Sequence, residues 1–111
     1  MALDKNLISG STAMLLLRLL SEKDMYGYEM IEELRRRSQN VFELKAGTLY
    51  PLLHGLEKKE CLVSYEKEAG GKTRKYYHIT AEGHQLLKEK MSDWKKYANA
   101  VSDVIMAEGL L

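Results

Sequence analysis

The residues best suited to chemistry in this chain are basic side chains set among glycines and tyrosines. The run "KTRKYYH" at 72–78 carries Lys72, Arg74 and Lys75 and no acidic residue. It begins directly after Gly70-Gly71, a pair typical of the tip of a β-hairpin. Basic side chains on such a hairpin could bind nucleic-acid phosphates or enter a minor groove. The alternative is a solvated hairpin whose charges only keep the protein soluble.

A second group of polar residues surrounds Pro51, the only proline of the chain. Leucines at 49, 52, 53 and 56 repeat at helical spacing and predict a helix that starts near Gly47 or Thr48. Pro51 then lies near the first turn, where a missing N–H costs little. The residues at or near this helix that could meet a phosphate or a base edge are Lys45, Thr48, Tyr50, His54 and Lys58. For Tyr50 the alternative is packing against the hairpin, and for His54 it is simple exposure.

The elements that must position these residues follow from the remaining patterns. Apolar periodicity predicts helices at 11–22 and 28–38, and two strand-like runs flank the glycine pair. Thr80 can cap a final helix from Ala81 to Ala107, about 40 Å long. The fold class is mainly α with a small β-hairpin (α+β), a winged helix-turn-helix with a long C-terminal dimerisation helix. Residues 1–79 would bind DNA and residues 80–111 would dimerise, within one structural domain.

One apolar stripe runs along the predicted final helix. Its members alternate at spacings of four and three: Leu87, Met91, Trp94, Ala98, Val101 and Ile105. Such a seam fits a partner helix from a second copy, which makes the protein a twofold homodimer. The dimer would hold two reading helices about 34–36 Å apart, on an inverted repeat of double-stranded operator DNA.

Trp94 has two interpretations within this stripe. It is either part of the dimer core or a ligand site, in which Trp94 and its copy stack on a flat aromatic small molecule. Neighbours for such a site would be Ala13, Met91 and Lys95. An aromatic residue on a helical stripe is more often core.

Composition narrows the functional classes. The chain has 111 residues, a formal net charge of +1 and a single cysteine, and no apolar run reaches the ~20 residues of a membrane span. No signal peptide is visible, so we expect a cytoplasmic protein without a membrane partner. The histidines and Cys61 lack the spacing of a metal site, and no cofactor loop or catalytic motif appears. We expect neither an enzyme nor a metal or cofactor.

Several quoted segments together resemble the PadR family of transcriptional regulators. They are "YGYEM" at 26–30, "GTLYPLLHGLEK" at 47–58, "GGKTRKYYHITAEG" at 70–83, and Trp94, and the likeness covers roughly residues 7–104. With its single final helix, the chain is similar to the short subgroup of the family, which includes LmrR-type multidrug sensors. The resemblance implies a homodimeric winged-helix DNA binder, usually a repressor, often released from DNA by a small molecule. It also places Trp94 at the matching position of those sensors.

The chain departs from the family pattern at two places. His54 and Gly55 stand where basic residues are common, and Glu60 stands where glycine is usual. Glycine is a preferred residue after a helix end, so the link into the hairpin differs here. The near-neutral charge and the His54-Gly55 pair also leave open another class, a winged-helix module that binds protein and not DNA.

Overall fold

The chain folds into a small head of helices and strands, from which one long helix extends. The computed structural model describes residues 11–106. In chain order the elements are α2 (Thr12–Glu22), β1 (Met25–Tyr26), α3 (Gly27–Arg37), α4 (Ala46–Lys58), β2 (Leu62–Ala69), β3 (Lys72–Ile79) and α5 (Ala81–Ile105). The predicted winged helix-turn-helix with a long final helix is confirmed. Residues 1–10 of the predicted DNA-binding region and the predicted helix end at Ala107 lie outside the described residues.

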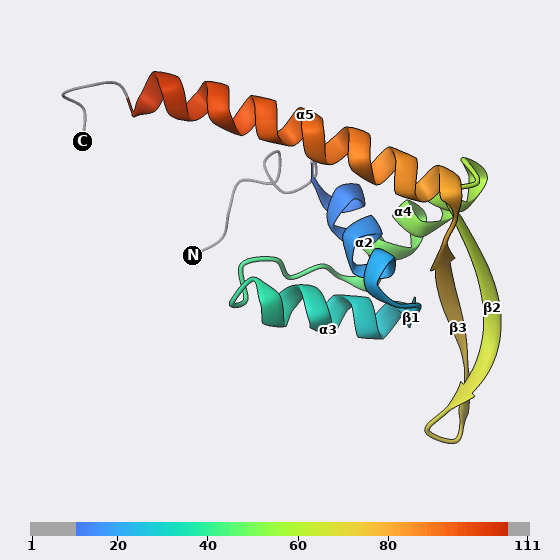
Figure 1. Ribbon diagram of the computed structural model, residues 1–111. Coiled ribbons are helices and arrows are strands. Elements are labelled where there is room, and N and C mark those ends of the chain that lie inside the picture. The colour runs from blue at the N-terminus through green and yellow to red at the C-terminus, as the bar shows by residue number, and fades with distance from the viewer. Residues whose placement is uncertain (1–10, 107–111) are drawn as a thin grey trace.

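Helix α2 lies between α5 and α3, and the sheet closes one side of the head (Figure 1). An ion pair on the surface joins α3 to α2, where the Arg37 guanidinium lies 2.6 Å from Glu22 Oε1. Arg36 and Arg37 also donate to Glu33, and these bonds lower the pKa of Glu33 to about 2. Arg35 donates to Glu32 as well, so all three consecutive arginines at 35–37 are paired on the head.

Helix α4 begins one residue earlier than the first of the two predicted starts, with Lys45 at its N-cap. The N–H groups of Thr48 and Leu49 both donate to the Lys45 carbonyl oxygen, at 2.9 Å each. Pro51 is thus slightly more than one turn inside the helix, and the bond it would donate to the Gly47 carbonyl is missing. The core leucines of α4 hold the helix despite this loss.

The β-sheet has three antiparallel strands in the order β1-β3-β2, and not only the two of the predicted hairpin. The two-residue strand β1 pairs with β3 through Met25↔Tyr77 and Tyr26↔Tyr76. Such a short strand leaves no alternating pattern to detect. The predicted tip at Gly70-Gly71 is confirmed, and both glycines have positive φ, as a two-residue type I′ turn requires.

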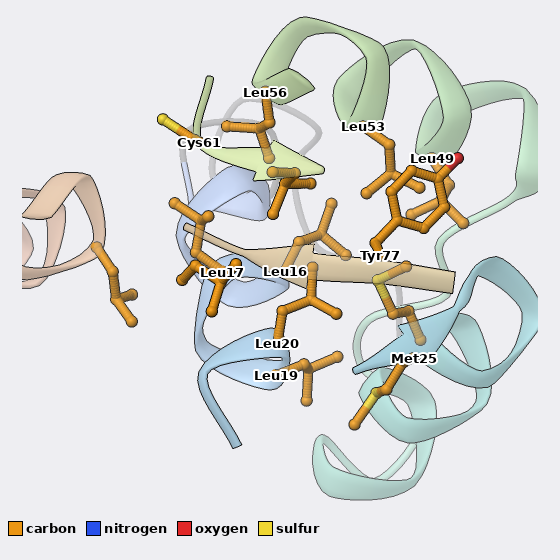
Figure 2. Packing of buried hydrophobic residues seen from close by; sticks show 14 of the residues in the cluster. Leu16, Leu17, Leu19, Leu20, Met25, Leu49, Leu53, Leu56, Cys61 and Tyr77 are labelled. Atoms are coloured by element: carbon orange, nitrogen blue, oxygen red, sulfur yellow. The ribbon is translucent and has the colours of Figure 1, made fainter. Parts of the chain in front are cut away.

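The core brings the inner face of the sheet against all the helices of the head. Tyr77 of β3 is only 1% exposed and points towards Leu49 and Leu53 of α4 (Figure 2). Below it in the figure lie the buried leucines of α2, among them Leu16 and Leu20. Because alternate residues of a strand face opposite sides, burial of Tyr77 turns Tyr76 to the outer face.

Helix α5 leaves the head after its first two turns. Leu87 is its last buried residue, and the stretch beyond it is mostly exposed. Figure 1 shows this half of α5 extending past the other helices. No helix among the described residues is both long enough and apolar enough to cross a membrane.

Candidate nucleic-acid interface

An open groove between α4 and β3 collects several of the predicted site residues. It is lined by Pro51, His54, Gly55, Glu57, Lys58 and Lys75. His54 and Lys58 lie one turn apart on the exposed face of α4, and Lys75 reaches the groove from the strand. Imidazole and ammonium groups at the edge of a groove can donate to phosphate oxygens or to base edges.

The first turn of α4 adds further donors. Lys45 and Thr48 are exposed beside the start of the helix. The N–H groups of a helix start and its dipole both favour an anion there. Lys45 and Thr48 therefore lie where a phosphate could be bound, and their contact with DNA stays a prediction.

Tyr50 has a different environment from its predicted partners. Its side chain is 41% exposed, yet its hydroxyl end lies against Gly27 at the start of α3. The predicted alternative, packing against the hairpin, misses this contact with α3. Tyr50 thus connects the two helices of the helix-turn-helix.

Glu57 is a groove residue that sequence reasoning missed. Its Oε2 accepts a hydrogen bond from the Ser64 hydroxyl of β2 at 2.9 Å. His54 Nδ1 lies 3.8 Å from the other carboxylate oxygen of Glu57. The i, i+3 spacing of His54 and Glu57 was a signal that could have found the pair. Burial raises the pKa of the Tyr77 hydroxyl, and the Glu57 carboxylate adds to the rise.

The three predicted cations of the hairpin do not share one face. Lys72 is exposed beside the glycine tip, and the Lys75 ammonium lies 5.6 Å from the centre of the Tyr77 ring on the inner face. Arg74 points to the outer face and is half-buried. Its guanidinium lies 4.4 Å from the centre of the Tyr26 ring, and its Nε donates to the Ala69 carbonyl at 3.4 Å. Arg74 is therefore engaged within the head.

The outer face of the sheet carries a tyrosine cluster. The rings of Tyr65 and Tyr76 stack at 5.7 Å, and Tyr26 meets Tyr76 edge-on at 5.4 Å. Lys67 is a basic wing residue that was not predicted, and its ammonium lies 5.2 Å from the centre of the Tyr76 ring. It faces Arg74 across the hairpin in the strand register.

Asp24 holds one edge of this cluster. It accepts from the Tyr65 hydroxyl at 2.6 Å and contacts His78 Nδ1 at 2.8 Å. Burial alone would raise the pKa of Asp24, but these two bonds outweigh it and lower the pKa. The same bond to Asp24 raises the pKa of Tyr65 to about 12. Asp24 thus joins β2 and the central strand β3 to the loop before β1.

The predicted interface stripe of α5 divides into a buried and an exposed part. Leu87 is 6% exposed and belongs to the core of its own head, so it offers little surface to a second copy. Trp94 is 54% exposed. The other exposed or half-buried apolar residues of this part are Met91, Tyr97, Ala98, Ala100, Val101, Val104, Ile105 and Met106.

The residues predicted around a ligand at Trp94 lie on two elements. Met91 and Lys95 are exposed on α5 beside Trp94. Ala13 is half-buried near the start of α2, a helix that packs against α5.

Comparisons with known proteins agree with this arrangement. The model of the transcriptional regulator PadR-like family matches residues 16–89. An uncharacterized protein X of Lysinibacillus sphaericus is 41% identical over 107 residues, which cover 95% of each chain. The structure of a transcriptional regulator from Clostridium thermocellum is 34% identical with a TM-score of 0.82, over 88% of this chain and 96% of that one.

A PadR family transcriptional regulator from Eggerthella lenta also has a similar structure. Its TM-score is 0.81 and its sequence identity 33%, over 93% of this chain and 88% of that chain. The family match spans the helix-turn-helix, the sheet and the start of α5. The chain therefore belongs to the PadR-like family of transcriptional regulators, which are DNA-binding proteins and not enzymes.

Proposed function

We propose that the protein is a homodimeric repressor that binds an inverted-repeat operator and is released by a flat aromatic effector. The observation that carries the DNA-binding part is the groove in which His54 and Lys58 of α4 meet Lys75 of β3. Two different elements supply these donors, so both must be in place for the surface to form. In this proposal α4 enters the major groove, and the β2–β3 hairpin acts as the wing that contacts phosphates.

Charge supports DNA as the partner of this surface. The chain as a whole carries +1, but Lys45, Lys58, Lys72 and Lys75 all lie exposed on α4 or the hairpin, or at the helix start. Local clusters of cations bind phosphates irrespective of the net charge of the protein. The exposed Lys67 on the outer face of the wing adds a further cation.

The exposed half of α5 supports dimerisation by residues 80–111. Trp94 and Ile105 are each half exposed, on the part of α5 that extends past the other described helices in Figure 1. Soluble proteins seldom expose a continuous apolar surface without a partner for it. A second copy of α5 would cover both stripes and place two α4 helices on one face of a duplex.

Trp94 also supports an effector site at the dimer centre. A planar compound between the two copies would stack on the indole rings, beside Met91, Lys95 and Ala13. Binding there would change the angle between the heads and lower operator affinity, if the effector prefers the arrangement that does not fit DNA. The intrinsic fluorescence of the single tryptophan reports such binding directly. Quenching of Trp94 without any change in operator affinity would contradict this part.

Salt dependence of DNA binding tests the main proposal. Duplexes are first selected from a random pool, and the affinity for the selected operator is then measured over a range of salt concentrations. Each lost phosphate contact lowers the slope of log affinity against log salt by about 0.9. We expect a Lys72→Ala, Lys75→Ala variant to lose about two units of slope, and Lys88→Ala on the exposed side of α5 to match the parent. A parent protein that selects no duplex would contradict the proposal.

Glu57 favours one rival function. A carboxylate in the groove opposes phosphate and could instead meet a basic segment of a protein partner. On this alternative the chain is a winged-helix protein-interaction module that does not bind DNA. The selection separates the two functions, because the module would enrich no palindromic duplex.

A further inference from the structure

Helix α4 and strand β3 of the wing both contact one pair of adjacent residues, Tyr26 and Gly27. On the side of α4, the hydroxyl of Tyr50 occupies the space of a Cβ at Gly27, and its Cζ would lie 2.8 Å from that Cβ. Gly27 is buried and does not have the positive φ that favours glycine. Space for the Tyr50 ring, and not backbone freedom, is therefore what a glycine supplies here.

On the side of the wing, Tyr26 receives two side chains of β3. The Arg74 guanidinium lies 4.4 Å from the centre of its ring, and the Tyr76 ring meets it edge-on at 5.4 Å. Arg74 also bonds the Ala69 carbonyl next to the hairpin tip. The outer half of the wing is thus tied to Tyr26 through Arg74.

The pair itself is anchored at the start of α3. Tyr26 is the N-cap of that helix, and its N–H donates to Glu29 Oε1 at 3.4 Å. The other carboxylate oxygen of Glu29 lies 3.0 Å from the Lys23 ammonium. Met25, the residue before the pair, is fully buried. The position of the pair is therefore fixed by the head.

We propose that Tyr26 and Gly27 form a positioning joint that sets the placement of the wing relative to α4. Arg74 and Tyr50 are then positioning residues, which act on operator affinity through this joint. The inference rests on the proposed DNA-binding function and goes beyond it, since it assigns roles to Tyr26 and Gly27, which are not proposed to contact DNA. It also separates Arg74 from Lys72 and Lys75, which act by contact with phosphate.

A double-mutant cycle on operator affinity tests the wing side of the joint. The variants are Tyr26→Leu, Arg74→Met and the two combined, with Tyr26→Phe as the conservative control. We expect each single loss to weaken operator binding about fivefold, the scale of one cation–π contact. The combined variant should lose no more operator affinity than the single variant that binds more weakly. Tyr26→Phe should bind the operator like the parent. Tyr26→Leu should keep the salt slope of the parent. Circular dichroism and thermal unfolding establish that each variant is folded.

Additive losses of operator affinity in this cycle would overturn the proposal that Tyr26 and Arg74 act through one joint. So would a salt slope lowered by about one unit in Arg74→Met, together with unchanged affinity in Tyr26→Leu, because Arg74 would then contact phosphate directly. Either result leaves the proposed function standing, as the parent still binds its operator. Failure of the parent itself to bind would overturn the proposed function and the joint together.

A second cycle tests the helix side. Gly27→Ala displaces the Tyr50 ring, and Tyr50→Ala removes it. We expect Gly27→Ala to lower operator affinity in the parent but to have no further effect once Tyr50 is alanine. An equal loss with and without the ring would show that Gly27 matters for a reason other than Tyr50, and would overturn this half of the joint.

Discussion

Gly83 lies so close to the carbonyl oxygen of Cys61 that no side chain fits between them. A Cβ at Gly83 would overlap that oxygen and lie 2.6 Å from Ile79 Cγ1. The same carbonyl accepts from the Thr80 N–H at 3.0 Å, and Thr80 caps α5 by accepting from the Gly83 N–H at 3.0 Å. The start of α5 is therefore locked to the start of β2, which sets the direction in which α5 leaves the head.

Gly83→Ala is expected to destabilise the protein although alanine is the better helix former. The added methyl group meets backbone and a buried isoleucine, which cannot swing aside, so we expect a loss of about 1–3 kcal/mol in the free energy of unfolding. Denaturant titration measures it. Gly47→Ala is the matched control, because nothing lies within 4 Å of a Cβ at Gly47 in α4. That variant should gain stability, by about 0.5–1 kcal/mol, and equal effects at both sites would contradict the account.

Glu60 adopts the left-handed conformation that usually belongs to glycine. Its φ is 62°, and it follows the C-cap residue Lys59 of α4. The N–H of Glu60 donates to Glu57 and that of Cys61 to Leu56, at 2.9 Å each, which is the bond pattern of a Schellman motif. Glu60 therefore completes the turn that ends α4, but its backbone is held in a strained conformation.

Glu60→Gly is accordingly expected to stabilise the protein. Relief of the left-handed strain contributes about 1–2 kcal/mol, and the greater freedom of glycine in the unfolded chain offsets part of it. A net gain of about 1 kcal/mol should appear in denaturant titrations. Glu60→Ala keeps a Cβ and should gain nothing. A loss of stability in the glycine variant would mean that the carboxylate itself stabilises the fold.

The bond from Tyr65 to Asp24 predicts an alkaline transition. It raises the pKa of Tyr65 to about 12 in the folded protein, against about 10 in an unfolded chain. Because the folded pKa is the higher one, the stabilisation is complete below about pH 10 and is lost as the pH rises towards about 12. NMR titration of the Tyr65 ring should show late ionisation in the parent and a pKa nearer 10 in Asp24→Ala. Asp93→Ala, on the exposed part of α5, should leave the Tyr65 titration unchanged, and identical curves for the parent and Asp24→Ala would refute the role of the bond.

Much of the fold could be predicted because its signals are local. Leucines at helical spacing identify α4, and Leu49, Leu53 and Leu56 are indeed its buried residues. The pair Gly70-Gly71 marks a turn that only positive φ can form. The order of the elements then brought His54 and Lys75 to one groove, since a winged helix places its third helix beside the hairpin.

The parts that escaped prediction depend on contacts between distant segments. Alternation along β3 predicts that Arg74 and Lys75 point to opposite faces of the sheet. No local pattern predicts that Arg74 contacts the Tyr26 ring on the outer face. The packing of Tyr50 on Gly27 joins two helices in the same way. Leu87 continues the spacing of the α5 stripe, and periodicity alone does not tell whether the head or a second copy covers a residue.

The exposed stripe of α5 leads to a prediction on assembly. Val101 lies on the proposed seam, and Val101→Glu would place a carboxylate from each copy beside the twofold axis. Desolvating two like charges costs several kcal/mol, so dimer affinity should fall at least ~100-fold. Asn99→Glu is the control, since Asn99 is exposed about 200° away around the same helix and its substitution should leave the dimer intact.

Sedimentation velocity over a range of concentrations measures the dimer affinity of both variants. The proposed dimer predicts monomers for Val101→Glu alone, with operator affinity reduced because one head then binds without the other, whereas a parent that sediments as a monomer at every concentration would contradict the seam.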